Sequence, residues 1–162
     1  MTIRKADVDD IDLLIKLRLD FLSEEKGPMS QEDQDALQPS LAAYFTKWIS
    51  SGAFVAFIAE EDEQVLSTAF LSIAERPPRQ AFPSRLVGTV YNVYTYAGFR
   101  RRGIATKVMS ALLEEAKALS LVSVDLLATA DGQPLYEKLG FRETEYTAMR
   151  IRKEELAARR PQ

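Results

Sequence analysis

A change of hydrophobic period near the middle of the chain constrains the fold more than any other feature of the sequence. Residues 86–95 (LVGTVYNVYT) are rich in β-branched and aromatic side chains, as a buried strand is. Three arginines and a glycine, Arg100 to Gly103, follow this stretch. Apolar side chains then recur on one helical face: Ile104, Val108, Met109, Leu112, Leu113, Ala116 and Leu119. The sequence therefore predicts a strand, a basic glycine turn and a long helix in direct succession.

Such a turn is suited to binding an anion. The first N–H groups of a helix have no partner within the helix, and they lie at the positive end of its dipole. Gly103 lets the backbone approach a ligand without a Cβ in the way, and Ala105 keeps the first helical turn low. The arginines add charge-assisted hydrogen bonds to phosphate oxygens. We therefore expect a phosphate-binding turn here.

The spacing around the turn excludes two common nucleotide-binding motifs. Gly98 and Gly103 have the interval of a nucleoside-triphosphatase P-loop, but Ile104 and Ala105 replace the Lys and the Ser or Thr that must follow. The chain also contains no Gly-x-Gly-x-x-Gly run, so a dinucleotide-binding fold has no fingerprint here.

Two sequence blocks resemble a known enzyme family. The pattern Arg100-x-x-Gly103-x-Ala105 resembles the Arg/Gln-x-x-Gly-x-Gly/Ala signature of the GNAT superfamily of N-acetyltransferases, whose turn holds the pyrophosphate of acetyl-coenzyme A (acetyl-CoA). Residues 135–141 (LYEKLGF) resemble an element near the C-terminus of that family, in the same order and separation. The resemblance implies an α/β (α+β) fold with a mixed, mainly antiparallel central sheet flanked by helices. It also implies transfer of an acetyl group from acetyl-CoA to a primary amine by direct attack.

The periodicity along the chain agrees with this fold, in the order β-α-α-β-β-β-α-β-α-β. Pro39 is expected to break or restart the second helix, and a loop with several prolines is expected over 75–84. We expect strands at 2–5, 54–60, 64–74, 86–95, 122–128 and 141–151, and helices at about 11–22, 31–49, 104–119 and 133–139. Residues 1–152 then form a single domain, and 153–162 a charged C-terminal tail.

Composition narrows the function further. The 162 residues include no cysteine and no histidine, which excludes thiolate nucleophiles, Ser-His-Asp triads and metal sites that use either residue. No metal is expected. The net charge of −3 argues against a nucleic-acid partner. No apolar run approaches a membrane span and no apolar signal follows Met1, so neither membrane nor export is expected, and the expected compartment is the cytoplasm.

The resemblance assigns the donor site residue by residue. The pantetheine arm is expected on the backbone near Val93, Tyr94 and Thr95, by strand addition. The pyrophosphate is expected on Arg100, Arg101, Arg102, Gly103, Ile104, Ala105 and Thr106. Thr129 stands where many members carry an asparagine that touches the pantetheine arm. Its hydroxyl can instead cap the following short helix, with Asp131 as the rival cap.

Tyr136 matches the family tyrosine that faces the sulfur of coenzyme A. A phenol with a pKa of about 10 is a weaker acid than a thiol with a pKa of about 8.5, so full proton transfer is uphill by about 2 kcal/mol. Donation of a hydrogen bond to the departing thiolate is the safer role. The alternative for Tyr136 is simple packing on a short helix.

The acceptor side is less defined. An ammonium with a pKa of about 10.4 must lose its proton before attack, at a cost of about 4.6 kcal/mol at neutral pH. Many members are thought to use a glutamate on the strand before the turn, yet residues 86–99 contain no Asp or Glu. Tyr91 and Asn92 are candidates for the acceptor side, with packing as their alternative. The loop over 75–84 and the acidic residues Glu24, Glu25, Glu32, Asp33 and Asp35 are further candidates, with a solvated loop and a solvated helix face as the favoured alternative.

Two rival functions follow from the same residues. A coenzyme A-binding or regulatory module without catalysis is favoured by the missing strand carboxylate. An anion-binding or nucleic-acid-binding domain would use the arginine cluster, against the negative total charge. The sequence leaves the acyl group and the acceptor open, and the resemblance makes a homodimer plausible.

Overall fold

A five-stranded sheet forms the centre of the molecule. The computed structural model describes residues 1–77 and 86–158. The sheet has the order β1-β2-β3-β4-β5, in which the first four strands are antiparallel and β5 is parallel to β4. Its elements are β1 (Thr2–Lys5), η1 (Val8–Asp10), α1 (Ile11–Lys26), α2 (Gln31–Ser50), β2 (Phe54–Glu61), β3 (Gln64–Glu75), β4 (Leu86–Thr95), η2 (Ala97–Phe99), α3 (Ile104–Ala118), β5 (Ser123–Asp125), α4 (Gln133–Lys138) and α5 (Lys153–Ala157).

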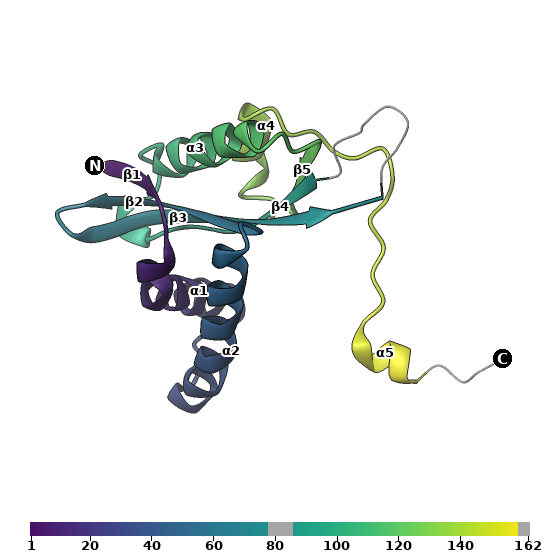
Figure 1. Cartoon of the computed structure of the whole chain (residues 1–162), viewed down its shortest axis with the longest axis horizontal. Helices are drawn as coiled ribbons and strands as arrows, with labels where there is room; N and C mark the ends of the chain where they lie inside the picture. Colours follow the sequence, from purple (N-terminus) through teal and green to yellow (C-terminus); the bar gives the residue numbers. More distant parts are fainter. Residues whose placement is uncertain (78–85, 159–162) are drawn as a thin grey trace.

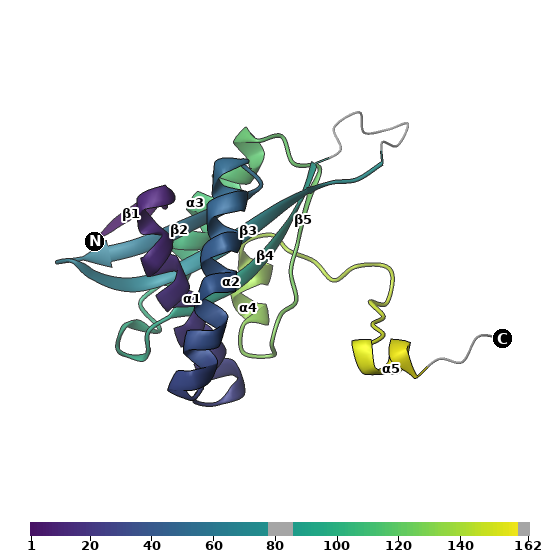
Figure 2. The ribbon, with the colours of Figure 1, turned by 60° about the horizontal axis from the view of Figure 1, so that its bottom comes forward.

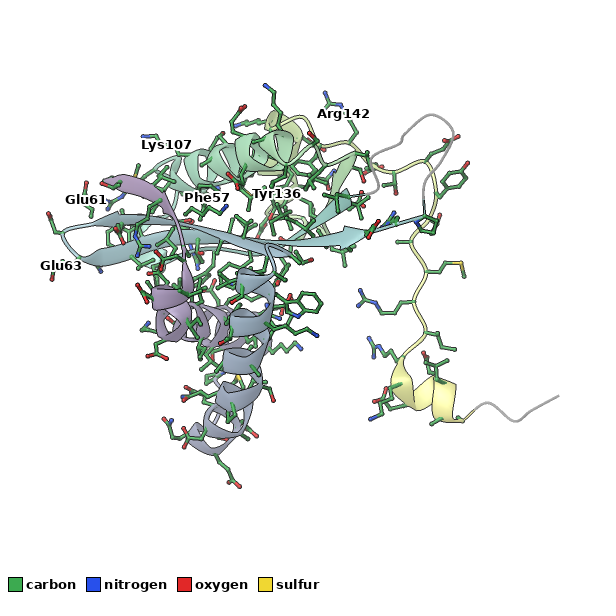
Figure 3. All side chains as sticks on the ribbon, viewed as in Figure 1. Phe57, Glu61, Glu63, Lys107, Tyr136 and Arg142 are labelled. Atoms are coloured by element: carbon green, nitrogen blue, oxygen red, sulfur yellow. The ribbon has the colours of Figure 1, made fainter. Side chains whose placement is uncertain are left out.

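The helices cover the two faces of the sheet in separate layers. Helices α3 and α4 lie on one face, and α1 and α2 lie on the other (Figures 1 and 2). Each layer has its own apolar core. On the α3 face, Val108, Met109 and Leu112 are fully buried against β2, β3 and β4, and Phe57 and Tyr136 pack on this cluster (Figure 3). On the other face, Leu14, Leu17, Phe45, Phe54 and Phe70 form the second cluster. The α/β fold class expected from the sequence is confirmed.

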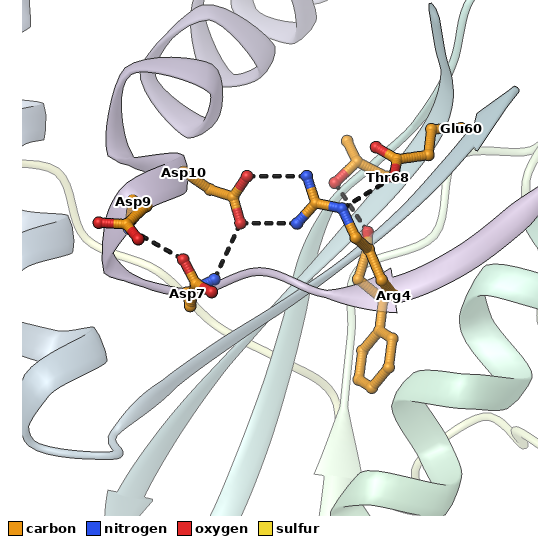
Figure 4. A network of polar contacts seen from close by, with 7 residues as sticks. Arg4, Asp7, Asp9, Asp10, Glu60 and Thr68 are labelled. Carbon is orange, nitrogen blue, oxygen red and sulfur yellow. Dashed lines mark hydrogen bonds and ion pairs between the residues drawn. The ribbon is translucent and has the colours of Figure 1, made fainter. Parts of the chain in front are cut away.

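An ion-pair cluster fixes the start of α1 to the edge of the sheet (Figure 4). The guanidinium of Arg4 donates to both carboxylate oxygens of Asp10, at 2.7 and 2.8 Å, and to Glu60 at 3.0 Å. The hydrogen bonds from Arg4 hold the pKa of Asp10 below its ordinary value. Asp7 completes the cluster by capping η1, where its side chain accepts from the Asp9 N–H at 2.9 Å.

The pairing of β4 with β5 is short. Val87, Gly88 and Thr89 pair with Ser123, Val124 and Asp125, and the described sheet contains no further pair between these two strands. Close packing requires glycine at the middle of this pairing, because a Cβ on Gly88 would lie 2.7 Å from the Leu71 side chain. Beyond Thr89, the remaining half of β4 faces an edge that β5 does not cover.

Two expectations about regular structure are wrong. Residues 141–151, expected as a final strand, pair with no strand in the described sheet. Phe141 packs on the α3-face cluster, whereas Met149 and Ile151 further along are exposed. The observed order of elements therefore lacks the expected last strand, and α5 forms within the expected C-terminal tail.

Pro39 does not break α2, because it lies on the exposed side, where water can take the place of the lost helix bond. Of the expected proline-rich loop, residues 78–85 lie outside the described residues. None of the helices described is both long enough and apolar enough to span a bilayer.

Candidate functional site

A β-bulge reshapes β4 at the start of its uncovered half. Thr68 pairs with Tyr94 and Phe70 pairs with Tyr91, so one residue of β3 opposes two residues of β4, Asn92 and Val93. Asn92 adopts a φ of 54°, in the left-handed region that asparagine tolerates better than most residues. The bulge therefore bends the strand where β5 has ended.

The side chain of Asn92 ties this bulge to α1. It is buried, accepts a hydrogen bond from Arg18 Nη1 at 3.1 Å, and donates to the Leu17 carbonyl at 3.4 Å. Because a buried amide must find partners for its polar atoms, these contacts fix the position of α1 relative to β4.

Replacement of Asn92 separates its two structural roles. We expect Asn92→Gly to lose the two side-chain hydrogen bonds and about 2 kcal/mol of unfolding free energy. Asn92→Ala should lose about 1 kcal/mol more, because alanine adds the cost of a positive φ. Urea denaturation of both variants measures the difference. Equal stabilities would contradict the strain of the bulge, and wild-type stability in both would contradict the bridge to Arg18.

Main-chain groups near the end of β4 are directed toward the uncovered edge. The Tyr96 N–H donates to the Leu66 carbonyl at 3.1 Å, so the main-chain groups of Tyr96 point toward β3. By the alternation of a strand, the main-chain groups of Thr95 and Val93 face the opposite edge. The Thr95 carbonyl there accepts a hydrogen bond from Arg100 Nε at 2.8 Å. Of the predicted pantetheine residues, Val93 and Thr95 thus lie on an edge that another chain or an amide-bearing ligand can pair with, whereas the main-chain groups of Tyr94 face β3.

The three arginines of the turn have different surroundings. Besides its bond to Thr95, Arg100 forms an ion pair with Glu24 of α1, so its charge holds the turn to β4 and α1. Arg102 lies over the ring of Phe99, 5.4 Å from the centroid. Arg101 adopts a φ of 63° and is exposed. The sequence predicted a cluster that faces phosphate, whereas the structure uses Arg100 to build the turn.

The first turn of α3 offers the anion-binding groups that the sequence predicted. Gly103 has a φ of 72°, and a Cβ built there would meet no heavy atom within 4 Å. The first hydrogen bond at this end of the helix runs from the Lys107 N–H to the Gly103 carbonyl, at 3.2 Å. The N–H groups of Ile104, Ala105 and Thr106 therefore have no acceptor within the helix. The buried Ile104 side chain anchors this turn to the core.

Tyr136 lies on α4, between that helix and the sheet (Figure 3). Its ring packs edge-on against Phe141, with 5.9 Å between the centroids, and it lines a cavity of about 760 Å³ beside β5. Burial raises the pKa of the Tyr136 phenol above its ordinary value. The group therefore stays protonated at neutral pH and is available as a hydrogen-bond donor.

Thr129 organises the turn that precedes α4. Its hydroxyl accepts from the Gly132 N–H at 3.2 Å, and its carbonyl accepts from the N–H groups of Gly132 and Gln133 at 3.0 and 2.9 Å. In the described structure the N-cap of α4 is Gly132, with no side-chain cap bond, so neither Thr129 nor Asp131 caps this helix as predicted. The hydroxyl has a local structural use in the turn, while its contact with a pantetheine arm stays a prediction.

Comparison with known proteins identifies the family. The profile of the acetyltransferase (GNAT) family matches residues 18–141, more than half of the chain. The chain belongs to the acetyltransferase (GNAT) family. A predicted acetyltransferase from Clostridium acetobutylicum, solved with acetyl-CoA, is 33% identical, with 92% of this chain and 95% of that chain covered and a TM-score of 0.79.

More distant structures share the GNAT fold. A GCN5-related N-acetyltransferase from Ralstonia eutropha JMP134 is 24% identical, with 93% of this chain and 97% of that chain covered and a TM-score of 0.75. Glucosamine-6-phosphate N-acetyltransferase from Arabidopsis thaliana is 19% identical, with the corresponding coverage 93% and 97% and a TM-score of 0.70. Among curated protein sequences, none matches the chain significantly.

In this GNAT acetyltransferase, Gly132 leaves room for the catalytic candidate Tyr136. A Cβ on Gly132 would lie 3.1 Å from Tyr136 Cε2 and 3.2 Å from Thr129 Oγ1. We expect Gly132→Ala to displace the ring by a few tenths of an ångström and to lower kcat several-fold, because a donor must keep hydrogen-bond distance to the reacting atom. Steady-state kinetics and acetyl-CoA titration measure this. A normal kcat would contradict the tight placement of Tyr136.

On the α1 face of the GNAT domain, the predicted acceptor residues have partners within the chain. The Tyr91 hydroxyl lies 3.0 Å from that of Tyr44, and burial raises the pKa of Tyr91 far above its ordinary value. Asn92 is held by Arg18, as described above. Their role in acceptor recognition stays a prediction, beside the packing role that the structure gives both.

Polar side chains of α1 reach the end of β4. Tyr96 donates to Asp20, and the Lys16 ammonium lies 2.5 Å from Asp20 and 3.1 Å from the Tyr96 hydroxyl. Burial raises the pKa of Tyr94 to about 12, and the nearby Glu24 adds to the rise. Glu24 is one of the predicted acceptor-side residues, whereas Lys16 and Asp20 were not predicted. The signal was present, since the three residues recur every four positions on one helix and so share a face.

Proposed function

We propose that this GNAT acetyltransferase transfers an acetyl group from acetyl-CoA to a primary amine by direct attack on the thioester. One observation carries the proposal. The N-terminus of α3 with the open Gly103, the uncovered edge of β4 and the partly buried phenol of Tyr136 belong to one strand–turn–helix region and its neighbouring α4. The similar Clostridium acetobutylicum protein was solved with acetyl-CoA, which supports the same donor here.

The donor's pyrophosphate is held mainly by main-chain groups in this proposal. The N–H groups of Ile104, Ala105 and Thr106 point along the helix axis toward the open space at Gly103. Arg101 and Arg102 contribute charge at the exposed rim, and Arg100 keeps the turn in place through Thr95. The main-chain groups near Val93 pair with the amides of the pantetheine arm. A Cβ at Gly103 would enter the space that the anion needs.

Acetyl transfer by direct attack requires stabilisation of negative charge at two atoms, the carbonyl oxygen and the departing sulfur. As the amine nitrogen bonds to the carbonyl carbon, negative charge develops on the carbonyl oxygen, and main-chain N–H near Val93 stabilises it. When the carbon–sulfur bond breaks, the Tyr136 hydroxyl donates a hydrogen bond to the departing thiolate. Residues 86–99 hold no carboxylate, so β4 itself supplies no Asp or Glu as base. Asp20 and Glu24 lie on the α1 side, where each is already paired with a cation, Lys16 and Arg100 respectively.

The test combines binding and turnover. Calorimetry with acetyl-CoA should show binding, and a panel of small amines, amino acids, polyamines and peptides with free N-termini should show release of free thiol with at least one class. No binding of acetyl-CoA would overturn the proposal. Binding without thiol release across the panel would favour the alternative, a coenzyme A-binding module without catalysis. The absence of Asp and Glu from residues 86–99 supports that alternative.

A further inference from the structure

Arg18 of α1 carries a positive charge that no carboxylate of the described structure balances. Of the acidic residues on the same helix that reach the end of β4, Asp20 is paired with Lys16 at 2.5 Å. Glu24 is paired in the same way with Arg100 of the turn before α3. The charges between α1 and β4 therefore cancel except at Arg18, which is left as the excess cation.

The guanidinium of Arg18 is held in place by neutral groups. Its Nη1 donates to Asn92 Oδ1 at 3.1 Å, and its central carbon lies 5.5 Å from the ring centroid of Phe21 and 5.7 Å from that of Tyr91. Aromatic rings attract a guanidinium and orient its plane, but they carry no net charge. Because the side chain is already positioned, it loses little conformational freedom when it binds a partner.

The remaining N–H groups of Arg18 are open to solvent. Its Nε and Nη2 donate to no acceptor in the described part of the chain. Among the same residues, no side-chain nitrogen is both buried and without a hydrogen-bond partner. Since Arg18 is only partly buried, these two free nitrogens must be reached by water. A dissolved anion can reach them by the same route.

Arg18 also lies beside the segment at which acetyl transfer is proposed. Its partner Asn92 belongs to the bulge of β4, and the next residue, Val93, has its main-chain groups on the uncovered edge of that strand. Helix α1 lies on the face of the sheet opposite α3, so Arg18 approaches this segment from the side away from the phosphate-binding turn (Figure 1). A small molecule bound to Arg18 is therefore next to the place proposed for the thioester.

We infer that Arg18 binds an oxyanion of the acceptor, and that the acceptor is a small molecule with both an amino group and a carboxylate or phosphate. The inference rests on the proposed acetyl transfer and names the class of amine that it uses. The N–H groups of Nε and Nη2 are parallel and match two oxygens of such a group, in charge-assisted hydrogen bonds. The same excess charge repels acceptors that carry only cations, such as diamines and polyamines.

Matched acceptors test this inference through thiol release from acetyl-CoA. The L-amino acids are compared with their amides, 2-aminoethyl phosphate with ethanolamine, and both sets with putrescine and spermidine. We expect kcat/KM of the best anionic acceptor to exceed that of its neutral counterpart at least about tenfold, because hydrogen bonds between charged groups are strong. The two anionic arms distinguish a carboxylate from a phosphate.

The variant Arg18→Gln separates binding of the anion from support of Asn92. We expect it to lower kcat/KM of the anionic acceptor about tenfold or more and to leave that of the neutral counterpart nearly unchanged. A purely structural role through Asn92 would lower both equally. Lys26→Gln is the matched control, because it removes one positive charge from the exposed last turn of the same helix and should keep the preference. Circular dichroism checks that both variants fold.

Three outcomes overturn the inference. These are equal kcat/KM for anionic and neutral acceptors, a preference for putrescine or spermidine, and weaker calorimetric binding of acetyl-CoA by Arg18→Gln, which would place the guanidinium at the donor. Absence of thiol release with every amine contradicts the proposed function instead. In that event, calorimetry with the amino acids and 2-aminoethyl phosphate still tests Arg18: binding that Arg18→Gln abolishes supports the inference, and absent or unchanged binding overturns it.

Discussion

Tyr136→Phe is expected to lower kcat about a hundredfold while acetyl-CoA binds with unchanged affinity, since positioned proton donors contribute roughly 10²–10⁴-fold to rates. The ring's packing against Phe141 is kept in this variant, so the fold should not change. Only the hydroxyl is lost, and in the proposed mechanism it acts as the thiolate departs. Steady-state kinetics with an active amine, together with calorimetry, separate the two effects.

The pH dependence gives an independent check on Tyr136. The phenol acts in its protonated form, and burial raises its pKa, so the active form persists beyond the ordinary value of about 10. We expect no loss of kcat from this group between neutral pH and pH of about 10, and a loss only above it. Full turnover by Tyr136→Phe would leave this tyrosine a packing role alone.

Gly103→Asp is expected to weaken acetyl-CoA binding about a hundredfold. The new carboxylate would stand in the open space before the α3 N–H groups and repel the pyrophosphate, at a cost of about 2–3 kcal/mol for partly screened charges. Calorimetry measures the affinity, and thermal unfolding measures the change in stability.

A second glycine offers a matched control for this substitution. Gly52, which follows α2, has the same φ of 72° and likewise no heavy atom within 4 Å of a built Cβ. Gly52→Asp therefore carries the same backbone strain, on the order of 1 kcal/mol, without a nearby anion site. We expect equal losses of stability in the two variants and a loss of affinity only at Gly103. Equal affinities would contradict the phosphate-binding role of the turn.

The strand, turn and helix around Gly103 were predictable because their signals are local. Periodicity predicted β4 and α3, and the sequence placed a glycine at the junction, where the structure shows a positive φ. The failure of the last strand has a physical cause: residues 141–151 contain β-branched and aromatic side chains that suit a strand, but a strand exists only where another segment supplies partners. Sequence pattern reports which residues suit a strand, and it carries no information on whether a neighbour is present.

The position of the main chain at the site could be predicted from the sequence, but the partners of the side chains could not. The direction of Arg100 toward Thr95 and Glu24 depends on where α1 lies, which no local pattern reports. The bridge from Arg18 to Asn92 joins residues 74 positions apart and gave no signal in the sequence. Lys16 and Asp20 share a helical face with Glu24, a regularity that helical spacing alone could have revealed.

The two apolar clusters on opposite faces of the sheet have a consequence for how this protein can change. Donor groups of the proposed site come from α3 and α4, whereas the α1 and α2 layer supplies the side chains near the acceptor. Substitutions without shared contacts have nearly additive effects on free energy, and this holds for residues of α1 other than Arg18 and Glu24, which contact Asn92 of β4 and Arg100 of the turn. Variation at those α1 positions can therefore alter which amine is accepted while the affinity for acetyl-CoA is retained. Acceptor specificity and donor affinity can thus evolve separately on one sheet.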